Sequence, residues 1–334
     1  MFNNDLYNEK FHDIDISSSS FLITGGAGFI GSNIVEYLLK NNAGHVRVID
    51  NLSNGYIENI QEFNKLNNFE FIKGDIRNLV DCQNAVKGIN YISHQAALGS
   101  VPRSISDPVT TNDVNISGFL NMLMAAKDSS TLKRFVYAAS SSTYGDSQEL
   151  PKIEGREGKP LSPYAVTKLV NELYAEVFSN IYGFNTVGLR YFNIFGPKQN
   201  PNNPYAAVIP IFCKAFLDSQ TPIINGDGVT SRDFTFVENA VQANIKALFA
   251  ENISKHEVFN VACGDQTSLN QMISILKDFS NKDLSVIYQA ERAGDVKHSK
   301  ANIDKIKETL GYSPKISFPD GLKIVYDWYM NSNF

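Results

Sequence analysis

The chain has 334 residues, of which 43% are hydrophobic and 19% charged, so it can bury a large core and is expected to form two structural units. Its net charge of -5 is spread along the sequence without a basic stripe, which argues against a nucleic-acid partner. No apolar run of about 18 residues predicts a membrane span, and the polar N-terminus lacks the apolar core of a signal peptide. We therefore expect a cytoplasmic protein. The three cysteines and five histidines show no ligand spacing, so neither a disulfide framework nor a metal site is predicted.

The pattern of the first two-thirds of the chain is an alternation of strands and helices. Residues 1–18 read as an N-terminal extension that we expect to be helical in part. The helix predicted first spans residues 32–42, and the predicted strands are 21–25, 45–50, 69–75, 89–97, 133–140 and 185–193. This order predicts an α/β fold with a parallel sheet covered by helices on both faces.

From about residue 196 the sequence becomes rich in Pro and Asn, which predicts a loop leading into a second, smaller unit. Residues 258–264 read as a late buried strand that returns the chain to the first unit. The expected domains are a dinucleotide-binding domain of residues 19–195 plus about 233–265, and a smaller α/β substrate domain of residues 196–232 plus 266–334.

A glycine-rich turn lies between the first strand and the first helix. In TGGAGFIGS, Gly25, Gly28 and Gly31 give the tight turn and close backbone approach that a dinucleotide pyrophosphate needs at a helix N-terminus. Asp50 ends the next strand, where a carboxylate accepts hydrogen bonds from ribose hydroxyls and repels the 2′-phosphate of NADP. The pattern predicts a Rossmann-type domain that binds NAD. Seen alone, the glycines would make only a turn and Asp50 would be an ordinary acid at a strand end.

The stretch SPYAVTK places a phenol and an ammonium group one helical turn apart. Ser162 is a suitable cap and Pro163 a suitable first residue for a helix, on which Tyr164 and Lys168 share a face. A nearby cation favours a phenolate, so Tyr164 is a candidate base. The alternative, a surface tyrosine beside a solvated lysine, remains open from this motif alone.

With both motifs on one chain, the sequence resembles the extended short-chain dehydrogenase/reductase family from Phe21 to the neighbourhood of Trp328. Other stretches match the family in the same order: HQAAL (94–98), DVNISG (113–118), YAASSSTYGD (137–146), LRYFNIFGP (189–197), SRDFTFVENAV (231–241) and ERAGDVKHS (291–299).

The resemblance implies roles for individual residues. Tyr164 is the proton acceptor from a sugar hydroxyl, Lys168 holds the nicotinamide ribose and lowers the pKa of the tyrosine, and Ser140 hydrogen-bonds the same hydroxyl. A serine run at a strand end can also be merely a cap. The implied cofactor-binding residues are Gly25, Gly28, Phe29, Ile30, Gly31, Asp50, Asn51, Ser53, Gly55, Asp75, Ile76, Gln95, Ala96, Ala97, Asn115, Tyr164, Lys168 and Tyr191. The implied substrate-binding residues are Ser100, Val101, Arg103, Ser141, Ser142, Asn193, Ala207, Val208, Asn225, Arg232, Arg292, Asp295 and Ser299. Arg232 and Arg292 suit a diphosphate, because guanidinium groups pair with phosphate in a bidentate manner.

The reaction is predicted from acids that are missing. Dehydratases of the family carry an Asp-Glu pair where this chain has Ser141 and Ser142, and the related decarboxylases keep a glutamate at the place of Ser142. What remains is epimerisation at C4 of a UDP-sugar. Hydride passes to NAD, the 4-keto sugar turns over, and hydride returns to its opposite face, so tightly bound NAD is regenerated in each turnover.

Within the epimerases, the chain resembles the bacterial branch that acts on N-acetylated UDP-hexosamines. Galactose-type epimerases typically have a bulky tyrosine at the position of Ser299, and a small residue there leaves room for an acetamido group. Ala207 is expected in the same pocket. We predict interconversion of UDP-GlcNAc and UDP-GalNAc for a surface polysaccharide. The alternatives are a UDP-glucose/UDP-galactose or UDP-hexuronic acid 4-epimerase, a net reductase, and a non-catalytic protein that binds NAD and a sugar nucleotide.

Two apolar helix faces are candidates for a homodimer interface. One follows Tyr164 and the other lies in residues 114–127. Because both helices are also expected to pack on the sheet, the same stripes can equally belong to the core.

Overall fold

The computed structural model describes residues 2, 6–200, 207–291 and 297–331. Its centre is a seven-stranded sheet in which every neighbouring pair of strands is parallel. Across the sheet, the strands are β11 (Glu257–Val261), β6 (Thr186–Tyr191), β5 (Arg134–Ser140), β4 (Tyr91–His94), β1 (Ser20–Thr24), β2 (His45–Asp50) and β3 (Phe69–Lys73). The strand order reverses between β1 and β4, which is where sheets of this kind bind ligands.

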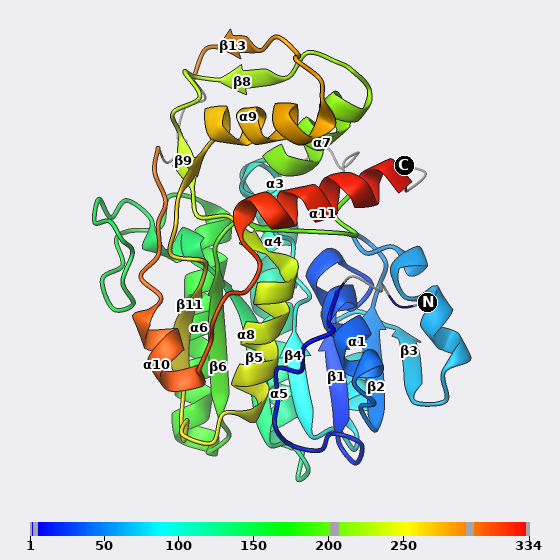
Figure 1. Ribbon diagram of the computed structural model, residues 1–334. Coiled ribbons are helices and arrows are strands. Elements are labelled where there is room, and N and C mark those ends of the chain that lie inside the picture. Colours follow the sequence, from blue (N-terminus) through cyan, green and yellow to red (C-terminus); the bar gives the residue numbers. More distant parts are fainter. Residues whose placement is uncertain (1, 3–5, 201–206, 292–296, 332–334) are drawn as a thin grey trace.

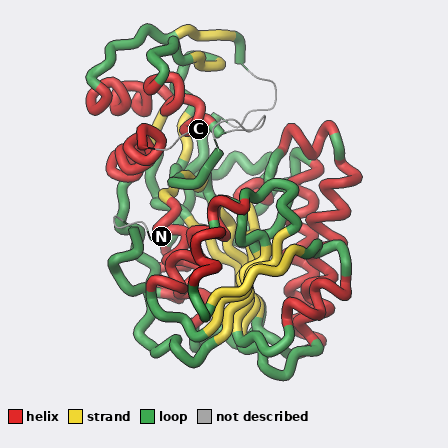
Figure 2. Tube along the Cα trace, turned by 90° about the vertical axis from the view of Figure 1, so that its right-hand side faces the viewer, coloured by secondary structure: helices red, strands yellow, loops and turns green. Residues whose placement is uncertain are grey.

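Helices cover both faces of the sheet, as Figure 2 shows from the side. On one face, α1 (Phe29–Lys40) and α8 (Val237–Phe249) pack against each other. On the other face lie α2 (Leu79–Val86), α5 (Phe119–Lys127) and α6 (Pro163–Tyr182). Each face has its own buried apolar cluster, so both faces of the sheet are shielded from solvent. The predicted doubly wound α/β fold is confirmed.

Short elements lie between these helices and strands. Helices α3 (Val101–Ser106) and α4 (Pro108–Asn112) pack on α6, and a π-helical stretch, Asp113–Gly118, continues into α5. The 3₁₀ helices are Ile57–Asn59, Gln61–Lys65 and Ser141–Tyr144.

A smaller group of elements lies beyond the carboxyl ends of the central strands (Figure 1). It contains α7 (Val208–Leu217), α9 (Leu269–Ser280), β8 (Ile223–Asn225) beside β13 (Ile287–Gln289), and β9 (Ser231–Arg232) beside β12 (Thr267–Ser268). The strands β7 (Ile194–Phe195) and β10 (Thr235–Phe236) connect it to the sheet, and α10 (Asp304–Leu310) and α11 (Phe318–Asn331) follow it. Through β10 and α8 the chain returns to β11 at the edge of the large sheet. The division into two domains at the predicted boundaries stays a prediction.

The N-terminal extension differs from the expectation. Its described residues form no helix, and the segment runs between α1 and α8 (Figure 1). Its backbone groups bond to side chains of those helices instead: Tyr7 N–H donates to Glu238, Phe11 N–H donates to the Tyr37 hydroxyl, and Lys40 donates to the Leu6 carbonyl. Because these partners satisfy the backbone, an internal helix is not needed to do so.

Helix α6 is set by its own sequence and fastened by a buried ion pair. The Ser162 hydroxyl accepts from Ala165 N–H at 3.1 Å, Pro163 occupies the first turn, and Gly183 ends the helix with φ +74°. From β6, Arg190 donates two hydrogen bonds to Glu172 of α6, at 2.9 and 2.7 Å. Its remaining guanidinium nitrogen bonds to Glu157. Both Arg190 and Glu172 are buried, so each charge depends on the other.

Within the residues that the structure describes, every helix is too short or too polar to span a lipid bilayer.

Replacing Glu172 by Gln tests this fastening. We expect the variant to lose about 3 kcal/mol of unfolding free energy, because it leaves the buried guanidinium of Arg190 without a full counter-charge. Urea denaturation measures the loss. Glu176→Gln, one turn further along α6 at an exposed position, is the matched control and should change stability by less than about 0.5 kcal/mol. Equal stability of the two variants would contradict the role of the ion pair.

Candidate active site

A cavity of about 530 Å³ opens at the carboxyl ends of β1, β2, β4, β5 and β6, where the strand order reverses. Its walls come from the glycine turn, the loops after these strands and the first turns of α6. Residues far apart in the sequence therefore meet in one place.

The glycine turn forms one end of the cavity. Gly25 has φ +65°, and a Cβ there would lie 2.7 Å from the backbone nitrogen of Ala96. A Cβ on Gly31 would lie 2.3 Å from the carbonyl oxygen of Gly25. Phe29 and Ile30 line the cavity at the start of α1, where helix geometry leaves backbone N–H groups without intrahelical partners. These residues fit the pyrophosphate of a dinucleotide.

Two carboxylates follow neighbouring strands at this end. Asp50 is 8% exposed and accepts from the N–H groups of Ala27 and Leu52, at 3.0 and 2.8 Å. Burial raises the pKa of Asp50, and the two backbone bonds oppose this shift. The Asp50 carboxylate lines the cavity, in a position to accept from ribose hydroxyls. Hydrogen bonds from Arg77 are the main reason that the pKa of Asp75 falls to about 2, so Asp75 is ionised at neutral pH.

The candidate catalytic residues lie together at the other end. The Tyr164 hydroxyl hydrogen-bonds Ser140, and Ser142 Oγ donates to Ser140 Oγ at 2.9 Å. Lys168 Nζ donates to the Ala138 carbonyl at 2.7 Å and lies 6.0 Å from the centre of the Tyr164 ring. The structure thus brings together the phenol, the hydroxyl and the ammonium group that SPYAVTK and the serine run predicted.

Burial dominates the pKa values of both Tyr164 and Lys168. Burial raises the pKa of Tyr164 above its usual value, and only the Ser140 hydrogen bond opposes the shift. The expected lowering of the Tyr164 pKa by Lys168 stays a prediction, and burial is the largest influence on this pKa in the protein alone. Burial also lowers the pKa of Lys168 to about 8. The negative charge of Glu172, one turn further along α6, opposes this shift.

A polar network supports the wall between the two ends. The Tyr191 hydroxyl donates to Gln95 Oε1 at 3.0 Å, and Gln95 Nε2 donates to Ser93 Oγ at 2.9 Å and Asn244 Oδ1 at 3.1 Å. Asn244 in turn donates to the Tyr191 hydroxyl at 2.7 Å. These bonds fix the orientations of Tyr191 and Gln95, both of which line the cavity.

All of the predicted cofactor residues except Asn115 line this cavity. Asn115 is buried beside it. Its side-chain oxygen accepts from Leu98 N–H at 2.8 Å, and its amide nitrogen donates to Thr167 at 3.1 Å. Asn115 therefore joins the loop after β4 to α6. It supports the cavity wall and does not line the cavity.

A second cavity, of about 250 Å³, shares Asn193, Ile194 and Ala207 with the first. Of the other predicted substrate residues, Val208, Asn225 and Arg232 line this second cavity, and Ser141 lines the first. The Arg232 guanidinium donates to the carbonyls of Ser231 and Lys297, at 3.0 and 3.2 Å.

Five other predicted substrate residues that the structure describes lie outside the walls of both cavities. Ser100 caps α3 by accepting from Arg103 N–H, Val101 is 40% exposed, and Arg103 donates to Asn54 at 3.3 Å. Ser142 reaches the site through Ser140, and Ser299 N–H donates to the Ser231 carbonyl at 3.1 Å, beside Arg232. Arg292 and Asp295 fall outside the described residues.

Several cavity residues were not predicted. Most of them lie in loops that follow strands, and the full set is Ile49, Asn54, Tyr56, Gly74, Leu98, Gly99, Val114, Ala138, Ala139, Ile194, Lys198, Gln199 and Asn200. Lys198, Gln199 and Asn200 belong to the Pro- and Asn-rich stretch that was read only as a connection. Their position directly after a β-strand of a doubly wound fold is the signal that would have identified them.

Comparison with known proteins gives consistent results. The family described as GDP-mannose 4,6 dehydratase matches residues 22–325. A putative UDP-glucose 4-epimerase of Methanocaldococcus jannaschii is 37% identical, with 93% of this chain and 99% of that protein covered.

Two solved structures are similar over nearly their whole length. A UDP-N-acetylglucosamine 4-epimerase from Methanobrevibacter ruminantium M1, in complex with UDP-N-acetylmuramic acid, has a TM-score of 0.88 and 38% identity, covering 93% of this chain and 98% of the other. A UDP-glucuronic acid 4-epimerase from Bacillus cereus, in complex with UDP-glucuronic acid and NAD, has a TM-score of 0.86 and 33% identity, covering 92% and 98%.

Proposed function

The chain belongs to the GDP-mannose 4,6-dehydratase family of extended short-chain dehydrogenases/reductases, and we propose that it interconverts UDP-GlcNAc and UDP-GalNAc by NAD-dependent epimerisation at C4. The coarser assignment, a nucleotide-sugar 4-epimerase with NAD as cofactor, follows from relatives of that activity that span nearly the whole chain. The observation that carries the proposal is the grouping of Ser140, Tyr164 and Lys168 at one end of a dinucleotide-shaped cavity, with serines beside them where a dehydratase needs acids.

The cavity fits NAD along its length. The glycine turn and the start of α1 would hold the pyrophosphate, Asp50 the adenosine ribose, and Lys168 the nicotinamide ribose. When bound, NAD accepts hydride from C4 of the sugar and returns it. The Asp50 carboxyl group would disfavour the extra phosphate of NADP, which speaks against a net reductase.

Tyr164 and Ser140 handle the proton. Tyr164 Oη takes the proton of the sugar 4-hydroxyl and returns it after the keto sugar has rotated to present its opposite face. Ser140 hydrogen-bonds the 4-oxygen of the sugar during both transfers. Lys168 carries its charge below pH about 8 and stabilises the phenolate from the neighbouring turn of α6.

The serines beside Ser140 explain why epimerisation is favoured over the reaction for which the family is named. Loss of water needs an acid at the positions of Ser141 and Ser142, and a hydroxyl cannot replace it at neutral pH. Ser142 instead donates to Ser140 and orients it. After oxidation at C4, these residues therefore support only the return of the hydride to the sugar, which completes the epimerisation.

The N-acetylated substrate is supported by small residues. Ala207 lies where the two cavities meet, and Ser299 is bonded through its backbone to the strand that carries Arg232. Neither side chain would fill the space that an acetamido group needs. The alternatives are the UDP-glucose and UDP-hexuronic acid pairs, and a non-catalytic sugar-nucleotide-binding protein. We propose further that the product serves a surface polysaccharide.

Incubation of the purified protein with UDP-GlcNAc, without added NAD, tests the function. NMR of the sugar H4 signal should show UDP-GalNAc, because the cofactor stays bound. Tyr164→Phe should lower kcat by about 10²–10⁴-fold, since it removes the acid–base group. Tyr182→Phe, at an exposed position of the same helix, is the control and should leave kcat unchanged. No conversion of UDP-GlcNAc, UDP-glucose or UDP-glucuronate, even with NAD supplied, would refute the epimerase assignment.

A second variant tests the preference for N-acetylated sugars. Ser299→Tyr should lower kcat/KM for UDP-GlcNAc by roughly 10–200-fold and leave kcat/KM for UDP-glucose nearly unchanged, because the ring would crowd only the 2-substituent. Ser299→Ala keeps the side chain small and should preserve both values. An equal fall for both sugars in Ser299→Tyr would show that this position does not select the substrate.

We also propose a homodimer, formed through α6. Four apolar side chains on one stripe of this helix are exposed, at 46–67%: Val166, Leu173, Val177 and Ile181. Val109 of the neighbouring α4 is 77% exposed. The other candidate stripe, in residues 114–127, packs mainly inside: Phe119, Met122 and Leu123 belong to the core between α5 and the sheet. The exposed apolar face is therefore carried by α6 with α3 and α4.

Sedimentation velocity measures the assembly. The wild-type protein should sediment as a dimer, and the double change Leu173→Glu with Val177→Glu should give a monomer, because it places charges in the apolar interface. Val229→Glu, an exposed apolar position outside this face, should remain dimeric. A wild-type protein that is monomeric at micromolar concentration would contradict the proposal.

A further inference from the structure

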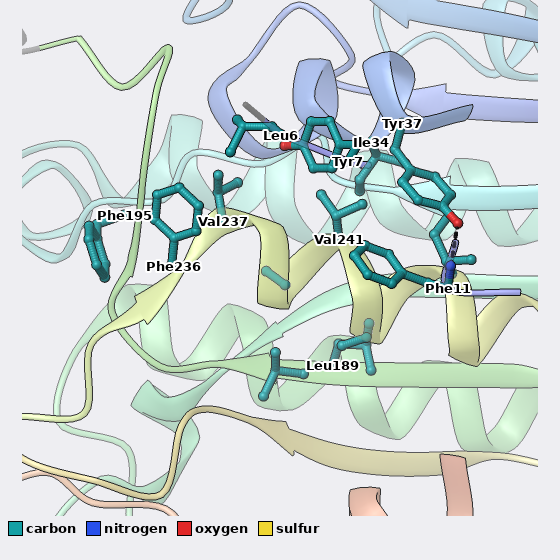
Figure 3. Close-up of a cluster of buried hydrophobic side chains, with 14 of the residues drawn as sticks. Leu6, Tyr7, Phe11, Ile34, Tyr37, Leu189, Phe195, Phe236, Val237 and Val241 are labelled. Atoms are coloured by element: carbon teal, nitrogen blue, oxygen red, sulfur yellow. Dashed lines mark hydrogen bonds between the residues drawn. The ribbon is translucent and has the colours of Figure 1, made fainter. Parts of the chain in front are cut away.

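The N-terminal segment lies outside the stretch that matches the family, yet it is built into the core. It runs between α1 and α8 and buries apolar side chains from its first described turn to its end: Leu6, Tyr7, Phe11 and Ile16. Figure 3 shows Tyr7 and Phe11 on either side of the α1 residues Ile34 and Tyr37, with Val237 and Val241 of α8 nearby. The segment thus contacts the helix whose N-terminus faces the dinucleotide cavity.

Tyr7 is the residue of this segment that reaches toward the site. Its hydroxyl donates to Asn33 Oδ1 at 2.6 Å, and both side chains are fully buried. Burial and the nearby carboxylates of Glu36 and Glu238 raise the pKa of Tyr7, so the hydroxyl keeps its proton and acts as the donor. The bond decides which way the Asn33 amide faces, because its oxygen must point to the phenol.

With this orientation, the Asn33 amide nitrogen faces two carbonyl groups. It donates to Phe29 O at 2.9 Å and to Pro197 O at 3.2 Å. Phe29 belongs to the first turn of α1, and Pro197 to the loop after β7. A single buried side chain therefore joins the start of α1 to the loop after β7.

The loop that Asn33 holds is part of that wall. Lys198 and Gln199 line the dinucleotide cavity directly after Pro197. Lys198 has φ +71°, an unfavourable backbone conformation for a residue with a side chain, so neighbouring contacts must maintain it. Its ammonium group bonds at 2.7 Å to Glu36 of α1, which is 2% exposed.

We infer that Tyr7 is a positioning residue of the cofactor site, which acts through Asn33 to hold the loop of Pro197, Lys198 and Gln199 against the start of α1 and so slows the release of NAD. The inference rests on the proposed function, because it takes the ligand of the large cavity to be NAD. The N-terminal segment is then a clamp on the cofactor site in addition to a cover for the core.

The test is the rate at which NAD leaves the purified protein, followed by chromatography of free nucleotide after rapid dilution into excess ADP-ribose. Tyr7→Phe removes only the hydroxyl and should speed NAD release by roughly five- to tenfold, the effect of one lost buried hydrogen bond. With saturating NAD, kcat for the UDP-sugar should stay at the wild-type value. A variant that merely loosened the fold would lower kcat and the melting temperature without selective loss of NAD.

Tyr37→Phe is the matched control. The Tyr37 hydroxyl accepts from Phe11 N–H at 2.7 Å, so this variant also removes a buried phenolic bond to the N-terminal segment. It lies one turn of α1 further from the cavity and has no hydrogen bond to Asn33 among those the structure describes. NAD release should match the wild-type rate. Equal release rates in Tyr7→Phe and Tyr37→Phe, fast or slow, would overturn the inference.

A double variant covers the case in which Tyr7→Phe does not fold. Tyr7→Phe with Asn33→Leu removes both polar partners, which avoids an unpaired buried oxygen, and also removes the bond to Pro197. It should release NAD as fast as, or faster than, Tyr7→Phe. Retention of NAD at the wild-type rate would refute the positioning role. Wild-type protein that neither carries NAD nor binds it when supplied would instead refute the proposed function, so the two failures are distinguishable.

Discussion

The close backbone approach at the turn between β1 and α1 is the constraint on which the rest of the molecule depends. Because there is no room for a Cβ between Gly31 and the Gly25 carbonyl, α1 packs closely against the sheet and its position along the sheet is fixed. That position decides where the N-terminus of α1 meets the cavity. It also decides which side chains of α1 reach the N-terminal segment, the loop after β7 and α8. A side chain at either glycine would therefore displace the start of α1 and the contacts that support it together.

The opposite end of the cavity depends on a balance of buried charges. Lys168 and Arg190 are buried cations, and Glu172 and Glu157 are the carboxylates that face them from α6 and the loop before it. Two positive and two negative charges share this region, so neither sign is left uncompensated in a poorly solvated place. Burial lowers the pKa of Lys168 to about 8. The Glu172 carboxylate, which already accepts two hydrogen bonds from Arg190, opposes this fall only in part. The ammonium group is thereby left available to the phenol and to a ribose.

What the sequence could predict was local, and what it missed was not. The glycine turn, the cap at Ser162 and the pairing of Tyr164 with Lys168 are each encoded within a few residues, and the structure places them as expected. The N-terminal segment was expected to be partly helical. Its hydrogen-bonding partners lie on helices distant in the sequence, and its own pattern cannot reveal them. The places of Lys198 and Gln199 depend on the chain's return to the sheet after β7. The pKa of Tyr164 depends on how deeply the finished fold buries it, which no motif states.

An epimerase of this kind uses NAD differently from a dehydrogenase, and this difference gives the clamp at Tyr7 a physical purpose. The hydride removed from C4 must return to the same sugar, so loss of the reduced cofactor between the two transfers would strand a keto sugar with no means of reduction. Slow release therefore favours turnover, whereas a dehydrogenase must exchange its cofactor in each cycle. Two connections outside the site favour slow release by holding one wall of the cavity. Tyr7 acts through Asn33, and Glu36 acts through Lys198. Neither Tyr7 nor Glu36 lines the cavity. Because both connections pass through α1, an extension that packs against α1 and α8 outside the cavity can control how long the cofactor stays.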